Sequence, residues 1–193
     1  MGSIHSLAEE FNFKSKNNPK FIILLVHGFT ASPSEVKPLG KFVYKYFKSE
    51  VTVTSILLPG HGISGENGYK ELDKIHYEDW ITAVHERIDQ LIRENKDTPI
   101  FLAGLSMGSA LIGEYLSNSV NTRILGGILL SPPLFIQGKI FLFVGILKYF
   151  IKYQAKDQET FDYFKKKNLF SYHIRSVRGV DEFRKLINKT RKN

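Results

Sequence analysis

A single serine between two glycines lies where an apolar run meets a helical pattern. The stretch AGLSMGS, residues 103–109, follows the run PIFL and precedes ALIGEYLSNS. Small residues such as Gly104 and Gly108 let a chain turn sharply from a strand into a helix, because bulkier side chains would collide with the neighbouring strand and helix. The stretch therefore predicts a strand followed at once by a helix, with Ser106 at the turn.

The rest of the sequence alternates apolar runs with helical patterns. Four runs predict strands, at residues 20–29, 50–62, 98–105 and 123–133. Helical spacing of apolar residues predicts a first helix with Val36, Leu39, Val43, Tyr46 and Phe47 on its buried stripe. A second helix has Tyr77, Trp80, Ile81, Val84, Ile88, Leu91 and Ile92 on its stripe, and a last helix has Val180, Phe183, Leu186 and Ile187. This alternation predicts an α/β fold of three layers, with a mostly parallel sheet between helices.

The residue composition and the spacing of apolar residues change after the fourth apolar run. From Leu134 to about Tyr172 the chain is aromatic, lysine-rich and helical in period, without the alternation of a strand. We interpret this part as a helical lid inserted into the core. The predicted division is a core over residues 1–134, a lid over residues 135–178, and a helix over residues 179–193 that returns to the core.

The positive charge is confined to the same part of the chain. The net charge is +8, yet residues 1–138 hold 13 Lys and Arg against 14 Asp and Glu, whereas residues 139–193 hold 14 against 5. A basic, apolar segment can contact anionic lipid at a membrane surface, and it can equally be a solvated face. No nucleic-acid recognition motif accompanies the charge, so we expect no nucleic-acid partner.

Three motifs together are similar to one known family. The segments LLVHGFTASPSEVKPLG, LPGHG and GLSMGSA occur in the order found in the carboxylesterase and monoacylglycerol lipase branch of the α/β-hydrolase fold. The resemblance extends from about Phe21 to the end of the chain. It implies a serine hydrolase that cleaves carboxylic esters through an acyl-serine intermediate, without a cofactor or metal.

The resemblance also implies roles for individual residues. Ser106 is the expected nucleophile, and the backbone N–H groups of Phe29 and Met107 form the expected oxyanion hole. His27, Gly28, Gly104 and Gly108 are expected to shape the loops around the serine. In the lid, we expect Phe141, Phe143, Leu147 and Phe150 to line a pocket for medium or long acyl chains of a small ester or lipid.

The partners of Ser106 are the missing part of this pattern. In the family, the acid and then the histidine follow later strands than the four predicted here. We therefore expect an α/β-hydrolase whose last strands are missing, shortened by about 60 to 80 residues at its C-terminus. His27 and His61 lie near the expected pocket, but their family counterparts shape loops. The alternative is a noncatalytic fragment or pseudoenzyme that binds lipid or a partner.

The remaining expectations concern the cellular setting. The N-terminal residues MGSIHSLAEEF lack the basic start and apolar run of a secretory signal, so we expect a cytoplasmic protein. Cysteine is absent, which excludes disulfides and cysteine-ligated metals. The sequence leaves the oligomeric state open.

Overall fold

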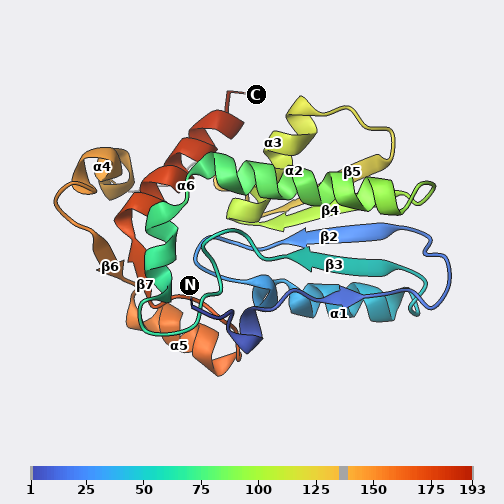
Figure 1. Ribbon diagram of the computed structural model, residues 1–193, viewed down its shortest axis with the longest axis horizontal. Helices are drawn as coiled ribbons and strands as arrows, with labels where there is room; N and C mark the ends of the chain where they lie inside the picture. Colours follow the sequence, from blue (N-terminus) through green and yellow to red (C-terminus); the bar gives the residue numbers. More distant parts are fainter. Residues whose placement is uncertain (1, 135–138, 193) are drawn as a thin grey trace.

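The sheet is mostly parallel and is covered by helices on both faces (Figure 1). The computed structural model describes residues 2–134 and 139–192. In spatial order the strands are β1 (Asn12–Phe13), β3 (Thr52–Ile56), β2 (Ile22–Val26), β4 (Ile100–Leu105) and β5 (Ile124–Leu130). Neighbours among β2, β3, β4 and β5 pair in parallel, and β1 runs antiparallel to β3. The predicted mostly parallel sheet is confirmed, and β1 is an edge strand that the sequence patterns did not indicate.

The central strand β2 is buried along its whole length. Alternate side chains of a strand point to opposite faces of the sheet. Ile22, Leu24 and Val26 therefore pack into the larger core, and Ile23 and Leu25 pack into a smaller core on the other face. This two-sided burial explains why β2 reads as an uninterrupted apolar run in the sequence.

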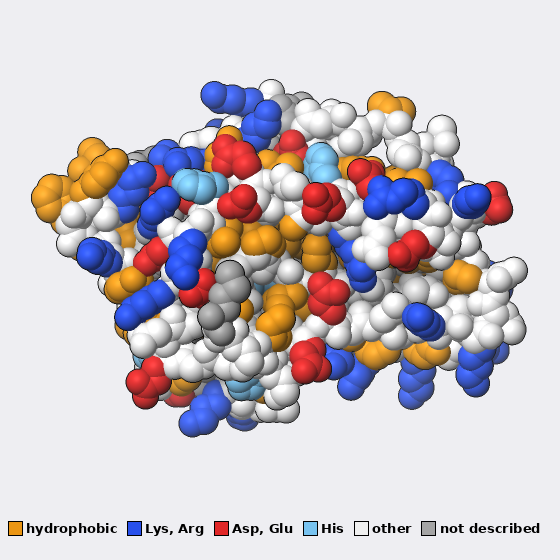
Figure 2. Space-filling model, viewed as in Figure 1, with side chains coloured by type: hydrophobic (Ala, Val, Ile, Leu, Met, Phe, Trp, Pro, Cys, Tyr) orange, Lys and Arg blue, Asp and Glu red, His pale blue; other side chains and the backbone are white. Residues whose placement is uncertain are grey.

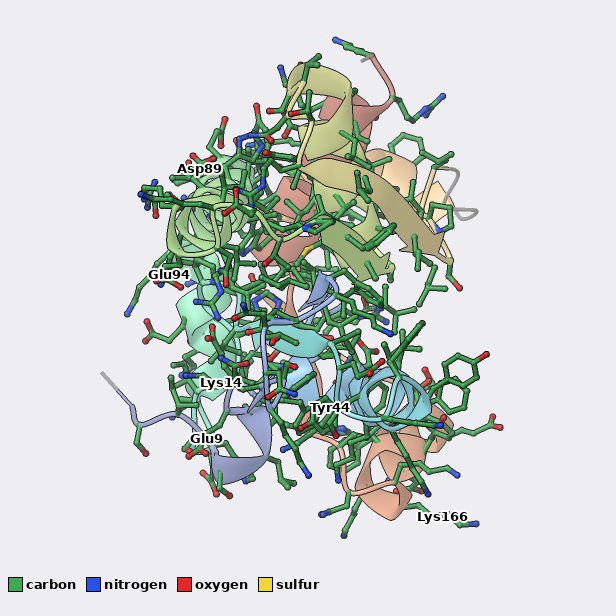
Figure 3. The ribbon with its side chains drawn as sticks, turned by 90° about the vertical axis from the view of Figure 1, so that its right-hand side faces the viewer. Glu9, Lys14, Tyr44, Asp89, Glu94 and Lys166 are labelled. Atoms are coloured by element: carbon green, nitrogen blue, oxygen red, sulfur yellow. The ribbon has the colours of Figure 1, made fainter. Side chains whose placement is uncertain are left out.

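The two cores are closed by helices on opposite sides of the sheet (Figure 3). The smaller core lies under α1 (Lys37–Tyr46), and the larger one lies under α2 (Tyr77–Glu94), α3 (Met107–Asn118) and α6 (Val177–Thr190). Short 3-10 helices lie at η1 (Ser6–Ala8), η2 (Pro33–Glu35) and η3 (Gly68–Lys74). The predicted stripe of α2 is confirmed by the complete burial of Trp80, Val84 and Ile88.

The predicted stripe of α1 is wrong at one position. Tyr46 is 69% exposed and its ring stacks on the exposed ring of Phe42. At 3.6 residues per turn, Tyr46 lies about 80° around the helix axis from the buried Val36. Tyr46 therefore faces away from the core, whereas Val43 lies nearly in line with Val36 and packs against the core.

The segment between β5 and α6, in which the sequence predicts a helical lid, contains two short strands as well as two helices. Its elements are α4 (Lys139–Leu147), β6 (Tyr153–Ala155), α5 (Gln158–Lys166) and β7 (Ile174–Ser176), and β6 pairs antiparallel with β7. The pair is fixed by contacts distant in sequence, because the hydroxyls of Tyr153 and Ser176 both donate to the carboxylate of Asp73 in η3. The final helix begins at Val177, two residues before the predicted boundary at residue 179.

Strand β5 forms the edge of the sheet opposite β1. Within the part of the chain that the structure describes, no strand pairs with its outer edge. Leu125, Ile128 and Leu129 are all more than two-fifths exposed. An unpaired, apolar edge strand of this kind is a surface on which another strand can pair.

Candidate active site

Ser106 occupies a strained turn between β4 and α3. Its backbone has φ +52° and ψ −114°, a conformation that costs a non-glycine residue about 1–3 kcal/mol. Hydrogen bonds hold the turn on both sides: the Ser106 N–H donates to the Leu130 carbonyl at 2.9 Å, and the Ser109 hydroxyl donates to the Ser106 carbonyl at 2.6 Å. The serine therefore lies at the carboxyl end of a parallel strand and at the N-terminus of a helix.

The two glycines of the turn lie where the backbones approach most closely. A Cβ atom on Gly104 would lie 2.3 Å from the carbonyl carbon of Gly108, and one on Gly108 would lie 2.2 Å from the Val26 oxygen. Neither neighbour is a flexible side-chain end, so an added side chain would force β2, β4 and α3 apart. Glycine at both positions allows α3 to start directly against β2.

The loop after β2 lies against the serine. A Cβ on Gly28 would lie 3.5 Å from the Ser106 Cβ. The Gly28 N–H donates to a Glu35 carboxylate oxygen at 2.9 Å, and the Thr30 N–H donates to His61 Nε2 at 3.1 Å. Between them, the Phe29 N–H has no hydrogen-bond acceptor among the residues that the structure describes. A free backbone donor beside a serine is the element that an oxyanion hole requires.

His27 and His61 are buried beneath this loop, and their ring nitrogens bond to backbone groups. His27 Nε2 accepts from the Leu58 N–H and Nδ1 donates to the Gly28 carbonyl; His61 Nδ1 donates to the Pro59 carbonyl at 3.0 Å. Burial lowers the pKa of His27 well below its ordinary value and the pKa of His61 to about 4. Both rings are therefore neutral structural groups that connect the loop to the segment after β3, and neither has a nitrogen free to accept a proton from Ser106.

The side chains of the other four histidines contact groups other than Ser106. His85 lies 2.9 Å from Glu114, between α2 and α3, and His5 accepts from the Leu7 N–H. His76 caps α2, and His173 follows α5. Among the described residues, no hydrogen bond joins any histidine to the Ser106 hydroxyl. The described site thus contains a serine and a free donor but no base in contact with the serine.

The four predicted lid residues have unlike surroundings. Phe141 packs against the larger core, with its ring centroid 6.5 Å from that of Phe183, which stacks on Phe29 at 5.4 Å. Leu147 is half-buried, whereas Phe143 is 56% exposed and Phe150 is 81% exposed. One lid ring, Phe141, thus connects through Phe183 to the loop beside Ser106, and two point into solvent.

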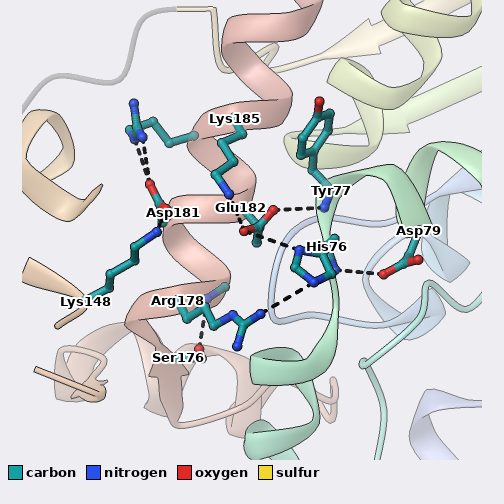
Figure 4. Close-up of polar contacts among 11 residues, drawn as sticks. His76, Tyr77, Asp79, Lys148, Ser176, Arg178, Asp181, Glu182 and Lys185 are labelled. Atoms are coloured by element: carbon teal, nitrogen blue, oxygen red, sulfur yellow. Dashed lines mark hydrogen bonds and ion pairs between the residues drawn. The ribbon is translucent and has the colours of Figure 1, made fainter. Parts of the chain in front are cut away.

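Sequence reasoning missed a cluster of buried carboxylates on α6 (Figure 4). Asp181 binds Lys148 of the lid at 2.6 Å and Arg184 at 2.8 Å, and Glu182 binds Lys185 at 2.6 Å. Burial raises the pKa of Asp181, but hydrogen bonds from Lys148 and Arg184 outweigh it and the pKa lies below its usual value. The spacing of three residues between acid and base is the only sequence signal for these pairs.

The same cluster contains the one group of possible metal ligands in the described residues. Atoms of His76, Glu78 and Glu182 lie within 4.8 Å of one another. However, the Lys185 ammonium already binds Glu182, and Arg178 lies 3.5 Å from His76. Two positive side chains make the group unfavourable for a metal ion and suit it to connecting α2 with α6.

The parallel sheet, the strained serine turn and the adjacent free donor define the class: a protein of the α/β-hydrolase fold. The sequence profile described as serine aminopeptidase, S33, matches residues 17–185, and the chain belongs to that family.

Two curated relatives match part of this chain. The chain is 35% identical over 99 residues to a thermostable monoacylglycerol lipase of Bacillus sp. strain H-257, and 26% identical over 155 residues to a carboxylesterase of Bacillus subtilis strain 168. The matches cover 51% and 79% of this chain, and 36% and 57% of the two relatives. This chain therefore aligns with only part of each relative.

Solved structures agree on the fold. A chain from the metagenome-derived lipolytic enzymes LipS and LipT superposes with a TM-score of 0.76 at 18% identity, covering 97% of this chain and 71% of that chain. A soluble variant of monoglyceride lipase from Saccharomyces cerevisiae gives a TM-score of 0.71 at 15% identity, covering 93% and 64%. No helix in the described part of this chain has the length and apolarity needed to cross a membrane.

Proposed function

We propose that the protein hydrolyses carboxylic esters, as lipases and esterases do, with Ser106 as the nucleophile. The observation that carries this proposal is the strained turn that presents Ser106 beside the free Phe29 N–H. The family match and the two curated relatives support ester hydrolysis as the reaction class.

In the proposed reaction, the Ser106 oxygen attacks the ester carbonyl carbon and loses its proton to a base. The carbonyl oxygen becomes an oxyanion, which accepts hydrogen bonds from the N–H groups of Phe29 and Met107, each worth about 2.7–4 kcal/mol in the transition state. The alcohol then leaves with a proton, and water hydrolyses the acyl-serine to release the acid and restore Ser106.

The proposal requires a base that the described residues do not bring to Ser106. His27 and His61 bond to backbone groups through their rings, so neither accepts the serine proton. The residues that the structure leaves undescribed, Met1, 135–138 and Asn193, include no histidine and no acidic side chain, so we propose that the base and its orienting acid come from outside residues 1–193. His27, Gly28, Gly104 and Gly108 then serve as residues that shape the site.

The proposed substrate is a small ester or lipid with a medium or long acyl chain. Support comes from the apolar path that leads from Phe29 through Phe183 to Phe141. The segment predicted as the lid, residues 135–178, contains α4 to β7, and we propose that its inner side covers this path.

We also propose that the outer side of the lid contacts an anionic lipid surface. Exposed apolar side chains in α4 and directly after it, among them Phe143, Tyr149 and Phe150, form a patch with basic side chains beside it (Figure 2). Flotation with phosphatidylserine vesicles tests this: replacing Tyr149 and Phe150 with Ser should reduce binding, while the same change at the exposed pair Phe42 and Tyr46 should not. Equal loss in both variants would contradict the proposal.

The nucleophile is tested by covalent labelling of the natural gene product that contains these residues. A fluorophosphonate probe should label Ser106, and Ser106→Ala should lose both labelling and hydrolysis of a p-nitrophenyl octanoate substrate. Ser131→Ala is the matched control, because Ser131 also follows a strand directly and has a positive φ of +48°. Labelling at another serine, or full activity in Ser106→Ala, would refute the proposal.

A further inference from the structure

The loop between β2 and η2 is held by hydrogen bonds on both sides of Phe29. On one side, the Gly28 N–H is bound by Glu35 and the Gly28 carbonyl by His27. On the other side, the Thr30 N–H is bound by His61, and the Thr30 carbonyl accepts from the N–H of Tyr172 at 2.9 Å and the hydroxyl of Ser171 at 3.2 Å. Because its neighbours are fixed, the free Phe29 N–H has a defined direction.

Glu35 is the only carboxylate among these contacts. It is the last residue of η2, a single turn that Ser32 caps by accepting the Ser34 N–H. Its 2.9 Å bond to the Gly28 N–H is charge-assisted, a type about twice as strong as a bond between neutral groups. The turn thus returns the carboxylate to the loop seven residues earlier in the chain.

The surroundings of Glu35 oppose its charge and also compensate it. Burial raises the pKa of the Glu35 carboxyl above its ordinary value, and the Gly28 N–H and the positive charge of Lys156 offset this only in part. Lys156 comes from the lid, directly after β6, and its ammonium donates to the Ser171 hydroxyl at 2.6 Å. Removing a carboxylate from water is costly unless the group is hydrogen-bonded or paired with a positive charge. Here the Gly28 N–H and Lys156 offset part of that cost.

The position of Glu35 relative to Ser106 indicates what that role is. A Cβ built on Gly28 would lie 3.0 Å from Glu35 Oε2 and 3.5 Å from the Ser106 Cβ. Gly28 thus lies next to both the carboxylate and the serine, and the absence of a side chain at this position leaves room for both. If the carboxylate releases the Gly28 N–H, Gly28 is held only through its carbonyl, which belongs to the same peptide unit as the Phe29 N–H, and that N–H loses part of its restraint. A misplacement of about 1 Å can cost on the order of 100-fold in rate.

We propose that Glu35 is a positioning residue of the oxyanion hole, which orients the Phe29 N–H by holding the Gly28 N–H. This inference rests on the proposed ester hydrolysis at Ser106. Glu35 acts through the backbone and touches neither substrate nor Ser106 in the reaction.

Three variants separate this role from general stabilisation. Glu35→Ala removes the acceptor, and Glu35→Asp keeps the charge but withdraws it by one methylene. Both variants should lower kcat about 10- to 100-fold and change KM by no more than about two-fold, because the oxyanion forms only in the transition state. Glu35→Gln keeps an acceptor at the same length and should retain kcat within about five-fold.

Glu10→Ala is the matched control. The Glu10 carboxylate also accepts a backbone N–H, that of Leu57 at 2.8 Å, but in a different loop. This variant should leave kcat and KM unchanged. Equal loss of kcat in Glu10→Ala and Glu35→Ala, or a raised KM with unchanged kcat in Glu35→Ala, would overturn the proposal.

A second readout does not depend on activity. In spectra of protein labelled with ¹⁵N at glycine and phenylalanine, the Gly28 and Phe29 amide signals should shift in Glu35→Ala and stay in place in Glu10→Ala. Absence of hydrolysis in the wild type would refute the proposed function alone, since these spectra still show whether Glu35 orders Phe29. Unchanged Gly28 and Phe29 signals in Glu35→Ala would refute the positioning role whether or not the protein hydrolyses esters.

Discussion

Acid should destabilise this protein through His61. The ring is 1% exposed, and both of its nitrogens are bonded in the neutral form, one to the Thr30 N–H and the other to the Pro59 carbonyl. Protonation would place a donor at Nε2 against the Thr30 N–H and a buried charge beside the loop at Ser106. The fold therefore resists the proton that an unfolded histidine accepts near pH 6.5.

The sign and magnitude follow from the lowered pKa. Between pH 6.5 and 4 the unfolded chain binds a proton at His61 and the folded chain does not, so the free energy of unfolding falls as pH falls. A difference of about 2.5 pKa units corresponds to about 3 kcal/mol once pH is below 4, of which about 2 kcal/mol is lost between pH 7 and 5. The pKa of His27 is also lowered by burial, which acts in the same direction.

Urea unfolding at pH 7, 6 and 5 measures this effect when the wild type is compared with His61→Gln. The glutamine accepts the Thr30 N–H but does not titrate, so the variant should be less stable at pH 7 and the gap should narrow by about 2 kcal/mol at pH 5. His173→Gln is the control, because the His173 side chain is exposed. A gap between wild type and His61→Gln that stays constant over this pH range would refute the reasoning.

Three further predictions concern the turn, the sheet edge and turnover. Gly108→Ala should lower the free energy of unfolding in urea by about 3 kcal/mol or more, because its Cβ would lie 2.2 Å from the Val26 oxygen. The control is Gly113→Ala on the same helix, where the nearest atom to the added Cβ is 3.5 Å away; it should raise the free energy of unfolding by up to about 1 kcal/mol. Ile128→Lys on the exposed edge strand should reduce self-association measured by light scattering, and no change would show that β5 does not drive association. Residues 1–193 alone should turn over p-nitrophenyl esters on the order of a million-fold more slowly than an enzyme of this class with a complete triad, and Ser106-dependent turnover near the full rate would show that a described residue serves as base.

The sequence determined those features that local spacing encodes. The buried run of β2, the stripe of α2 and the serine turn are each specified within one short window, where burial on one or two faces fixes the period of apolar residues. The order of these windows also specified the mostly parallel sheet, because consecutive parallel strands require a crossover connection, which is usually a helix.

Tertiary structure decided the features that depend on distant partners. The strands β6 and β7 contain three residues each and are fixed by Asp73, some 80 and 103 residues away. Phe143 and Phe150 point into solvent because of how α4 packs on α6. Phenylalanine is found at buried positions as well, so the residue type alone did not predict their exposure. Likewise, the bond from Gly28 to Glu35 closes a turn whose residues have no distinctive spacing. Such contacts depend on which surfaces the chain brings together, so only the folded protein reveals that a partly buried carboxylate holds the loop beside Ser106.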